Sequence, residues 1–241
     1  MKLAIVKTCF WLLAHLVVQK DTFAIATNLY VNKQYKESIK ICTSQLNKLD
    51  MKDTLFEKYL FLRISGYLES HDYAFAIRDC VTLVKIKPQN TGYYIELSYL
   101  YGSLKQYEDC LSVLRKALEL NSNEIYILNN LSYYSNQVSK YNDTIKYANE
   151  GLKYAAKPEW KGVLLNNRGY GYIGLKRYTD ALDEINQAII LGPDNSFAYC
   201  YRAIANIGLK RMETVCSDLN KAKSLGAIAM TEDLIKENCK N

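Results

Sequence analysis

Apolar residues recur along most of the chain at spacings of three and four, which is the pattern of amphipathic helices with one buried face. The periodic stretches run for about 12 to 15 residues and come in pairs joined by short polar segments. Only three prolines and 11 glycines occur in 241 residues, so little in the chain would interrupt a helix. The pattern predicts an all-α protein built from helical hairpins.

The hairpins form a repeat in which one position marks each unit. The marker residues are Tyr35, Tyr73, Tyr107, Tyr141, Tyr178 and Met212, at intervals of 38, 34, 34, 37 and 34 residues. Small or medium-sized residues stand three positions after each marker, and small residues stand nine positions before it in five of the six units. We expect the small residues to let the two helices of a hairpin approach closely. The tyrosine should begin the second helix and fill the wedge between neighbouring hairpins, which explains the 21 tyrosines.

A single hairpin cannot bury its own apolar face, so neighbouring hairpins must stack in a line. The predicted hairpins are 19–56, 57–90, 91–124, 125–161, 162–195 and 196–227. Residues 228–241 predict a terminal capping helix, in which Ile228, Leu234 and Ile235 should pack inward.

The fifth hairpin, 162–195, resembles a tetratricopeptide repeat at nearly every signature position. The matching residues are Leu165, Gly169, Tyr172, Tyr178, Ala181, Ala188 and Pro193. The resemblance extends over about residues 19–227 and is weakest in 19–56. It implies a tetratricopeptide (TPR) α-solenoid, a right-handed superhelix that acts as a non-catalytic scaffold and binds a protein or extended peptide in its concave groove.

In this family the first helix of each hairpin lines the groove. Carried onto this chain, the groove residues are Tyr99, Tyr126, Asn129, Tyr133, Asn136, Asn166, Tyr170 and Ile173, with Cys200 near the edge. Asparagine amides can hydrogen-bond the backbone of an extended peptide, and tyrosines offer broad contact area. The alternative is that these side chains only pack within the protein and bind no ligand. A subclass grips C-terminal carboxylates with lysine and arginine, but the corresponding positions here hold Phe23, Phe61, Ile95 and Asn129, so that activity is not expected.

The sequence offers no motif for catalysis, a cofactor or a metal. A G-x-G-x-x-G pattern at 169–174 lies inside a predicted helix and follows no strand, so it does not indicate a dinucleotide site. His15 and His71 lie far apart, and no cysteine pair has zinc spacing. Solvated helix faces are the expected positions of Asp79, Asp109 and Glu184. We therefore expect no enzyme activity, no cofactor and no metal.

Nucleic-acid binding is the alternative function, because pentatricopeptide hairpins of similar length read single-stranded RNA. The net charge of +6 is spread along the chain without a basic run, and the groove positions carry no basic residues to meet phosphates. The sequence therefore favours a protein or peptide partner over RNA. It identifies neither the partner nor the oligomeric state.

The N-terminus resembles a secretory leader. Lys2 and Lys7 precede the uncharged stretch 8–18, which is too short to span a bilayer. We expect 1–18 to be a signal peptide of a protein exported to a bacterial periplasm or cell surface, and no other membrane segment. The alternative is an uncleaved apolar helix that caps the first repeat in a cytoplasmic protein.

The seven cysteines divide by position. Core packing is expected for Cys42, Cys80 and Cys110, which stand where small apolar residues belong. Cys216 and Cys239 lie on two predicted helices that run antiparallel about a turn near Gly226, so they could meet. Exported bacterial tetratricopeptide proteins that this tail resembles often carry such a pair. The resemblance implies a disulfide in an oxidising compartment and two free thiols in the cytosol.

Overall fold

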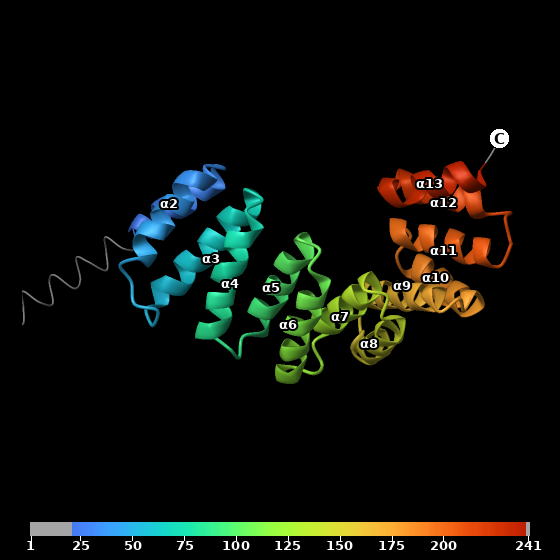
Figure 1. The fold of residues 1–241 in the computed structure, drawn as a ribbon, viewed down its shortest axis with the longest axis horizontal. Helices are drawn as coiled ribbons and strands as arrows, with labels where there is room; N and C mark the ends of the chain where they lie inside the picture. Colours follow the sequence, from blue (N-terminus) through green and yellow to red (C-terminus); the bar gives the residue numbers. More distant parts are fainter. Residues whose placement is uncertain (1–20, 240–241) are drawn as a thin grey trace, which may run out of the picture. The chain divides into compact units, whose positions relative to one another are not determined.

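The computed structural model describes residues 21–239, and all regular secondary structure in this range is helical (Figure 1). The predicted signal peptide, 1–18, lies outside the described residues. The chain divides into two compact units, 1–105 and 106–241. Each unit is described by itself.

The first unit contains a helix over residues 21–31 and four further helices. These are α2 (Tyr35–Leu46), α3 (Thr54–Glu69), α4 (Tyr73–Ile86) and α5 (Thr91–Ser103). From α2 onward, each helix packs against the next along the chain (Figure 1). Two of the helix starts are capped by side chains: Asp53 accepts a hydrogen bond from the Leu55 amide, and Asn90 accepts one from the Gly92 amide.

The second unit contains eight helices among the described residues. These are α6 (Tyr107–Leu120), α7 (Ile125–Gln137), α8 (Tyr141–Tyr154), α9 (Pro158–Gly174), α10 (Tyr178–Leu191), α11 (Ser196–Gly208), α12 (Val215–Ser224) and α13 (Ile228–Asn238). Consecutive helices pack together, and so do the first helices of successive hairpins, α7 with α9 and α9 with α11. Contacts are therefore made between neighbours in the sequence, which is the packing of a solenoid.

The marker tyrosines begin helices as predicted: each of the five is the first residue of a second hairpin helix. The wedge role is visible at Tyr178, because a Cβ built on Gly208 of the next hairpin would lie 2.5 Å from its ring carbon Cζ. Met212 departs from the pattern. It is exposed, and α12 begins only at Val215.

In the first and fourth hairpins, the small residues nine positions before and three positions after the marker face each other. In the first hairpin the Ser38 hydroxyl donates to the Ala26 carbonyl at 2.8 Å, and in the fourth the Ser132 hydroxyl donates to the Thr144 carbonyl at 3.0 Å. All four residues are buried. The two helices of a hairpin thus come close enough for a side chain of one to hydrogen-bond the backbone of the other.

Each turn within a hairpin contains one residue in the left-handed region, and none of these residues is glycine. They are Lys33, His71, Lys105, Ser139, Lys176 and Lys210, with φ between 57° and 61°. Each stands two positions before a marker residue. The turn geometry is therefore as periodic as the helices.

Two predictions about polar and apolar faces are wrong. Asp79 and Glu184 do not lie on solvated faces, because each is largely buried in an ion pair with an arginine of the same hairpin, Arg63 and Arg168 respectively. Asp109 is exposed as expected.

The capping helix is formed, but Ile228 does not pack inward. It is exposed at the start of α13. Leu234 and Ile235 do pack against the core of the last hairpin, as expected. The fifth hairpin also differs in its boundary, because α9 begins at Pro158, ahead of residue 162. Proline suits the first helical position, where no amide donor is needed.

Candidate functional site

The eight groove residues differ widely in exposure. Tyr99 lies in the first unit and the other seven in the second. Tyr99, Tyr126 and Tyr133 are 59%, 53% and 42% exposed. Asn129, Tyr170 and Ile173 are half-buried, whereas Asn136 and Asn166 are only 7% and 5% exposed. The tyrosines are accessible to a ligand, and the last two asparagines are not.

The asparagines of the second unit connect α7 to α9. The Asn167 amide nitrogen Nδ2 donates to Oδ1 of Asn129 at 3.1 Å, and Nδ2 of Asn136 donates to the Asn167 backbone carbonyl at 3.3 Å. These contacts fasten the first helices of two successive hairpins. For Asn136 this is the packing role that the sequence left open as the alternative to ligand binding.

Aromatic rings cluster along the same helices. Tyr126 meets Trp160 edge-on with ring centroids 4.4 Å apart, and Tyr170 lies 4.5 Å from Tyr201. Burial raises the pKa of the Tyr170 phenol. Tyr133 packs edge-on against Tyr134 at 5.2 Å and leaves much of its own ring exposed. The second unit thus contains several separate pairs of aromatic rings.

Cys200 does not reach the groove edge. Its side chain is completely buried in the core of the last hairpin, beside Ala203 and Leu219. Burial raises the pKa of its thiol to about 11, so it stays protonated at neutral pH.

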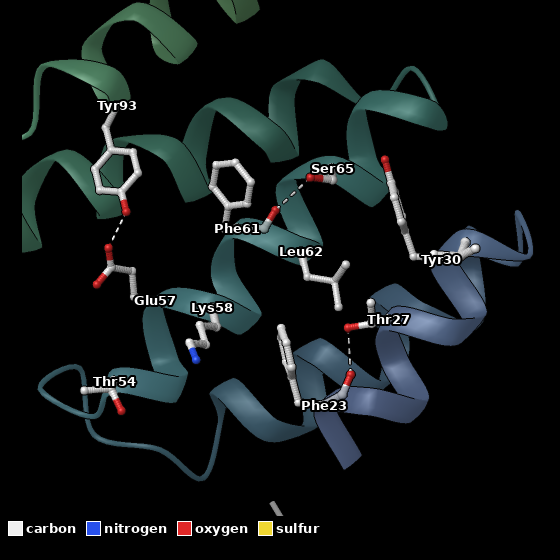
Figure 2. Close-up of a pocket in the computed structure, with 11 residues that line it drawn as sticks. Phe23, Thr27, Tyr30, Thr54, Glu57, Lys58, Phe61, Leu62, Ser65 and Tyr93 are labelled. Atoms are coloured by element: carbon white, nitrogen blue, oxygen red, sulfur yellow. Dashed lines mark hydrogen bonds between the residues drawn. The ribbon is translucent and has the colours of Figure 1, made fainter. Parts of the chain in front are cut away.

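A large hollow lies in the first unit, between the helix 21–31 and α3 (Figure 2). It is a groove of about 750 Å³. Figure 2 shows the side chains of Phe23 and Tyr30 from the first helix and of Phe61 and Leu62 from α3 around it. The other lining residues are Thr27, Val31, Thr54, Glu57, Lys58, Ser65 and Tyr93.

Two hydroxyls in this groove are already hydrogen-bonded within the protein. Thr27 donates to the Phe23 carbonyl at 2.9 Å, and Ser65 donates to the Phe61 carbonyl at 3.1 Å. Each bond stays within its own helix, so these side chains present their carbon atoms to the groove. The surface that results is predominantly apolar, with two phenylalanines from successive hairpins.

Polar groups lie at one end of the groove. The Tyr93 hydroxyl donates to the Glu57 carboxylate (Figure 2), and Lys87 lies 3.7 Å from the same carboxylate. Burial, followed by the hydrogen bond to Glu57, raises the pKa of Tyr93 to about 12. Lys58 is exposed beside them. An apolar groove with charged groups at one end can hold a large apolar side chain and orient the chain that bears it.

Sequence reasoning missed this groove. From the sequence alone, Phe23 and Phe61 are notable only because they occupy positions where a carboxylate-binding subclass has lysine. They stand 12 positions before Tyr35 and Tyr73, so two phenylalanines at equivalent places in consecutive hairpins were the available signal.

The last two helices are joined covalently. The structure places Cys216, in α12, and Cys239, after α13, in a disulfide with Cα atoms 5.6 Å apart. Both residues are half-buried. The bond spans the turn at Gly226, about which the two helices fold back on each other.

Two further properties concern only residues 21–239. Within this range no helix is both long and apolar enough to cross a membrane. The same residues contain no group of three His, Cys, Asp or Glu side chains placed to hold a metal ion.

No protein-family model matches the sequence, and no curated protein matches it either. Solved structures do resemble the fold. A tetratricopeptide repeat protein from Parabacteroides merdae superposes with a TM-score of 0.63 at 19% identity, covering 91% of this chain and 82% of that one. The C-terminal part of a TPR repeat-containing protein from Cytophaga hutchinsonii gives 0.59 at 18% identity, covering 86% and 80%.

A third similar structure is MamA from Desulfovibrio magneticus RS-1, with a TM-score of 0.62 at 15% identity over 73% of this chain and 97% of that one. At these identities the likeness concerns the fold. Together with the periodic turns, the tyrosine-led helices and the packing of sequence neighbours, it shows that this chain has the fold of a tetratricopeptide-repeat solenoid.

Proposed function

We propose that this protein is a non-catalytic scaffold that binds a segment of another protein, and that the apolar groove of the first unit is its main contact site. The observation on which this proposal rests is the groove of about 750 Å³ flanked by Phe23 and Phe61. Phe61 is 47% exposed, so a large apolar ring borders the groove without being covered by the chain's described residues. Exposed apolar surface of this kind marks binding sites.

The chemistry of the groove selects the partner. Its walls are aromatic and aliphatic, and its charged end holds Glu57 and Lys58. A segment with one or two large apolar side chains, flanked by polar residues, would fit. Tyr126 and Tyr133 of the second unit are also exposed, and we propose them as a separate contact surface for a protein ligand.

A peptide-display selection against the full chain tests the proposal. Selected peptides should carry apolar anchor residues, and their affinity for the Phe61→Ala variant should fall about tenfold or more, measured by fluorescence anisotropy. Phe75→Ala is the matched control, because Phe75 is a similarly exposed phenylalanine of α4 that does not line the groove. Equal binding by the Phe61→Ala variant and the parent protein would contradict the groove assignment.

We also propose that the protein is exported. The apolar stretch 8–18 behind two lysines supports a leader, and the Cys216–Cys239 disulfide suits an oxidising compartment. Cell fractionation with N-terminal sequencing of the native protein is the test. Recovery of a cytosolic protein that retains residues 1–18 would contradict export.

A further inference from the structure

The terminal helix α13 makes few non-covalent contacts with the rest of the second unit. Thr231 is its one buried residue. The Thr231 hydroxyl donates to the Ala227 carbonyl at 2.9 Å, one turn earlier in the chain, so it does not reach α12. Leu234 and Ile235 are half-buried against Val215, Leu219 and their neighbours. The apolar contact that holds α13 is therefore small.

The polar contacts between α12 and α13 are also weak. Lys223 lies 3.9 Å from Glu232, and both side chains are about half exposed, so water screens the pair. An isolated helix of 11 residues is marginal in water. Non-covalent forces alone would leave α13 in frequent exchange between docked and released states.

The disulfide provides the firm attachment of α13 to α12 that these weak contacts do not. Cys216 is the second residue of α12 and Cys239 directly follows α13, so the bond ties the far ends of a helical hairpin. It closes a loop with a sequence separation of 23 residues. Closing a loop of this size shifts an opening equilibrium by a factor on the order of a hundred.

The turn between the two helices can act as a hinge. Gly226 has φ of +105°, a conformation that glycine adopts without strain, and a Cβ built there would meet no atom within 4 Å. No side chain packs against the turn at Gly226, so the neighbouring residues do not restrict a change in its backbone angles. The half-buried position of both sulfur-bearing residues leaves the bond within reach of a small thiol.

We propose that α13 is a latch closed by the Cys216–Cys239 disulfide and opened by a dithiol reductant. One thiolate of the reductant attacks a sulfur of the bond and forms a mixed disulfide, and its second thiol then displaces the protein sulfur. The protein gains two electrons and two protons as two thiols, and the reductant leaves as its own disulfide. Release of α13 uncovers the apolar surface formed by Val215, Leu219 and Ala222 at the end of the solenoid.

Hydrogen exchange of the full chain, read by mass spectrometry, tests the latch. The oxidised protein is compared with protein treated with dithiothreitol. Amides of 228–238 should exchange about tenfold faster or more after reduction, while those of α10 should not change. The Cys216→Ser/Cys239→Ser variant should show the fast exchange with or without dithiothreitol, because it never forms the bond.

Three results would overturn the proposal. The first is equal protection of 228–238 in the oxidised and reduced proteins. The second is a loss of protection throughout α10, α11 and α12 on reduction, because the bond would then support the whole end of the unit and not one helix. The third is an intact mass showing that both thiols are free in protein prepared without reductant.

Discussion

The guanidinium of Arg63 forms a bidentate ion pair with the carboxylate of Asp79 across the second hairpin. Nε donates to Oδ2 at 2.7 Å and Nη2 donates to Oδ1 at 2.9 Å. The two residues are 16 positions apart, and the same separation recurs in two later hairpins. The equivalent pairs are Arg168 with Glu184 at 2.6 Å and Arg202 with Asp218 at 2.6 Å. A buried ion pair is thus a repeated element of this solenoid.

The other three hairpins fill the same two positions with apolar residues. Counted from the marker residues, these are Ile25 and Ile41, Leu97 and Val113, and Leu131 and Tyr147. The chain therefore contains its own replacements for the ion pair. This provides a direct test of how much the charged pair contributes.

We predict that Arg63→Leu alone destabilises the protein by about 3–5 kcal/mol, because it leaves the Asp79 carboxylate buried and uncompensated. The double variant Arg63→Leu/Asp79→Val should recover most of that loss, since it removes both charges. Urea unfolding followed by far-UV circular dichroism measures both effects. If the double variant were as unstable as the single one, the cost would come from lost packing and not from an unpaired charge.

The contact between Tyr178 and Gly208 makes a second prediction. A Cβ at position 208 would lie 2.5 Å from the tyrosine ring, so Gly208→Ala should destabilise the protein by about 1–3 kcal/mol through overpacking. Gly192→Ala is the control. Its Cβ would find no atom nearer than 3.7 Å, and its unfolding midpoint in urea should stay close to that of the parent protein. Equal effects of the two substitutions would contradict the wedge role of Tyr178.

The four unbridged cysteines of the described chain are buried and should resist alkylation. Burial raises the pKa of Cys42 and Cys200 to about 11 and that of Cys80 and Cys110 to about 12. Their thiolate fraction at neutral pH is therefore negligible. Peptide mapping after iodoacetamide treatment should find these thiols unmodified in native protein and modified in denatured protein. Rapid labelling of any one of them in the native protein would place that thiol at the surface.

The same thiols predict a loss of stability in alkaline solution. A cysteine in the unfolded chain ionises near its ordinary pKa of 9.0, whereas the buried thiols ionise only near 11 to 12. Between these values the unfolded state binds fewer protons than the folded state, so the free energy of unfolding falls as pH rises. The urea concentration at the midpoint of unfolding should therefore decline between about pH 9 and pH 11. A flat profile would mean that these thiols do not determine the alkaline limit.

The left-handed turn residues allow a stabilising substitution. Lys176 has φ of 57°, a region that costs non-glycine residues free energy. Lys176→Gly should relieve this strain, although glycine loses more backbone entropy on folding. The free energy of unfolding should therefore stay the same or rise by up to about 1 kcal/mol. Lys161→Gly is the contrast, because position 161 lies inside α9 and glycine there should cost about 1 kcal/mol. Differential scanning calorimetry distinguishes the two outcomes.

The sequence was sufficient for the fold because its repeat is local. The spacing of the tyrosines predicted the starts of five helices, and the small residues around them predicted which backbones meet, as the Ser132–Thr144 hydrogen bond illustrates. These features depend on periodicity within one hairpin, which a single sequence displays. The exception is Met212, which lies three positions before the start of α12.

Features that depend on a neighbouring helix could not be predicted in the same way. Asp79 and Glu184 look solvated on their own helices, and only their pairing with an arginine of the preceding helix in the folded hairpin reveals their burial. Asn136 and Asn166 occupy groove positions by count, yet close packing of α7 and α9 buries both. The hollow beside Phe61 depends on which surfaces remain uncovered, and periodicity does not describe that.

The buried arginines have a consequence for how the solenoid unfolds. Each also donates from Nη1 to the second helix of the preceding hairpin: Arg63 to Thr43, Arg168 to Asn149 and Arg202 to Asn186. When the preceding hairpin melts, each arginine keeps the carboxylate of its own hairpin but loses its Nη1 acceptor, so melting of one hairpin should destabilise the next. These links connect the first two hairpins to each other and the last three to one another, so we expect each set to unfold as a block instead of fraying one helix at a time.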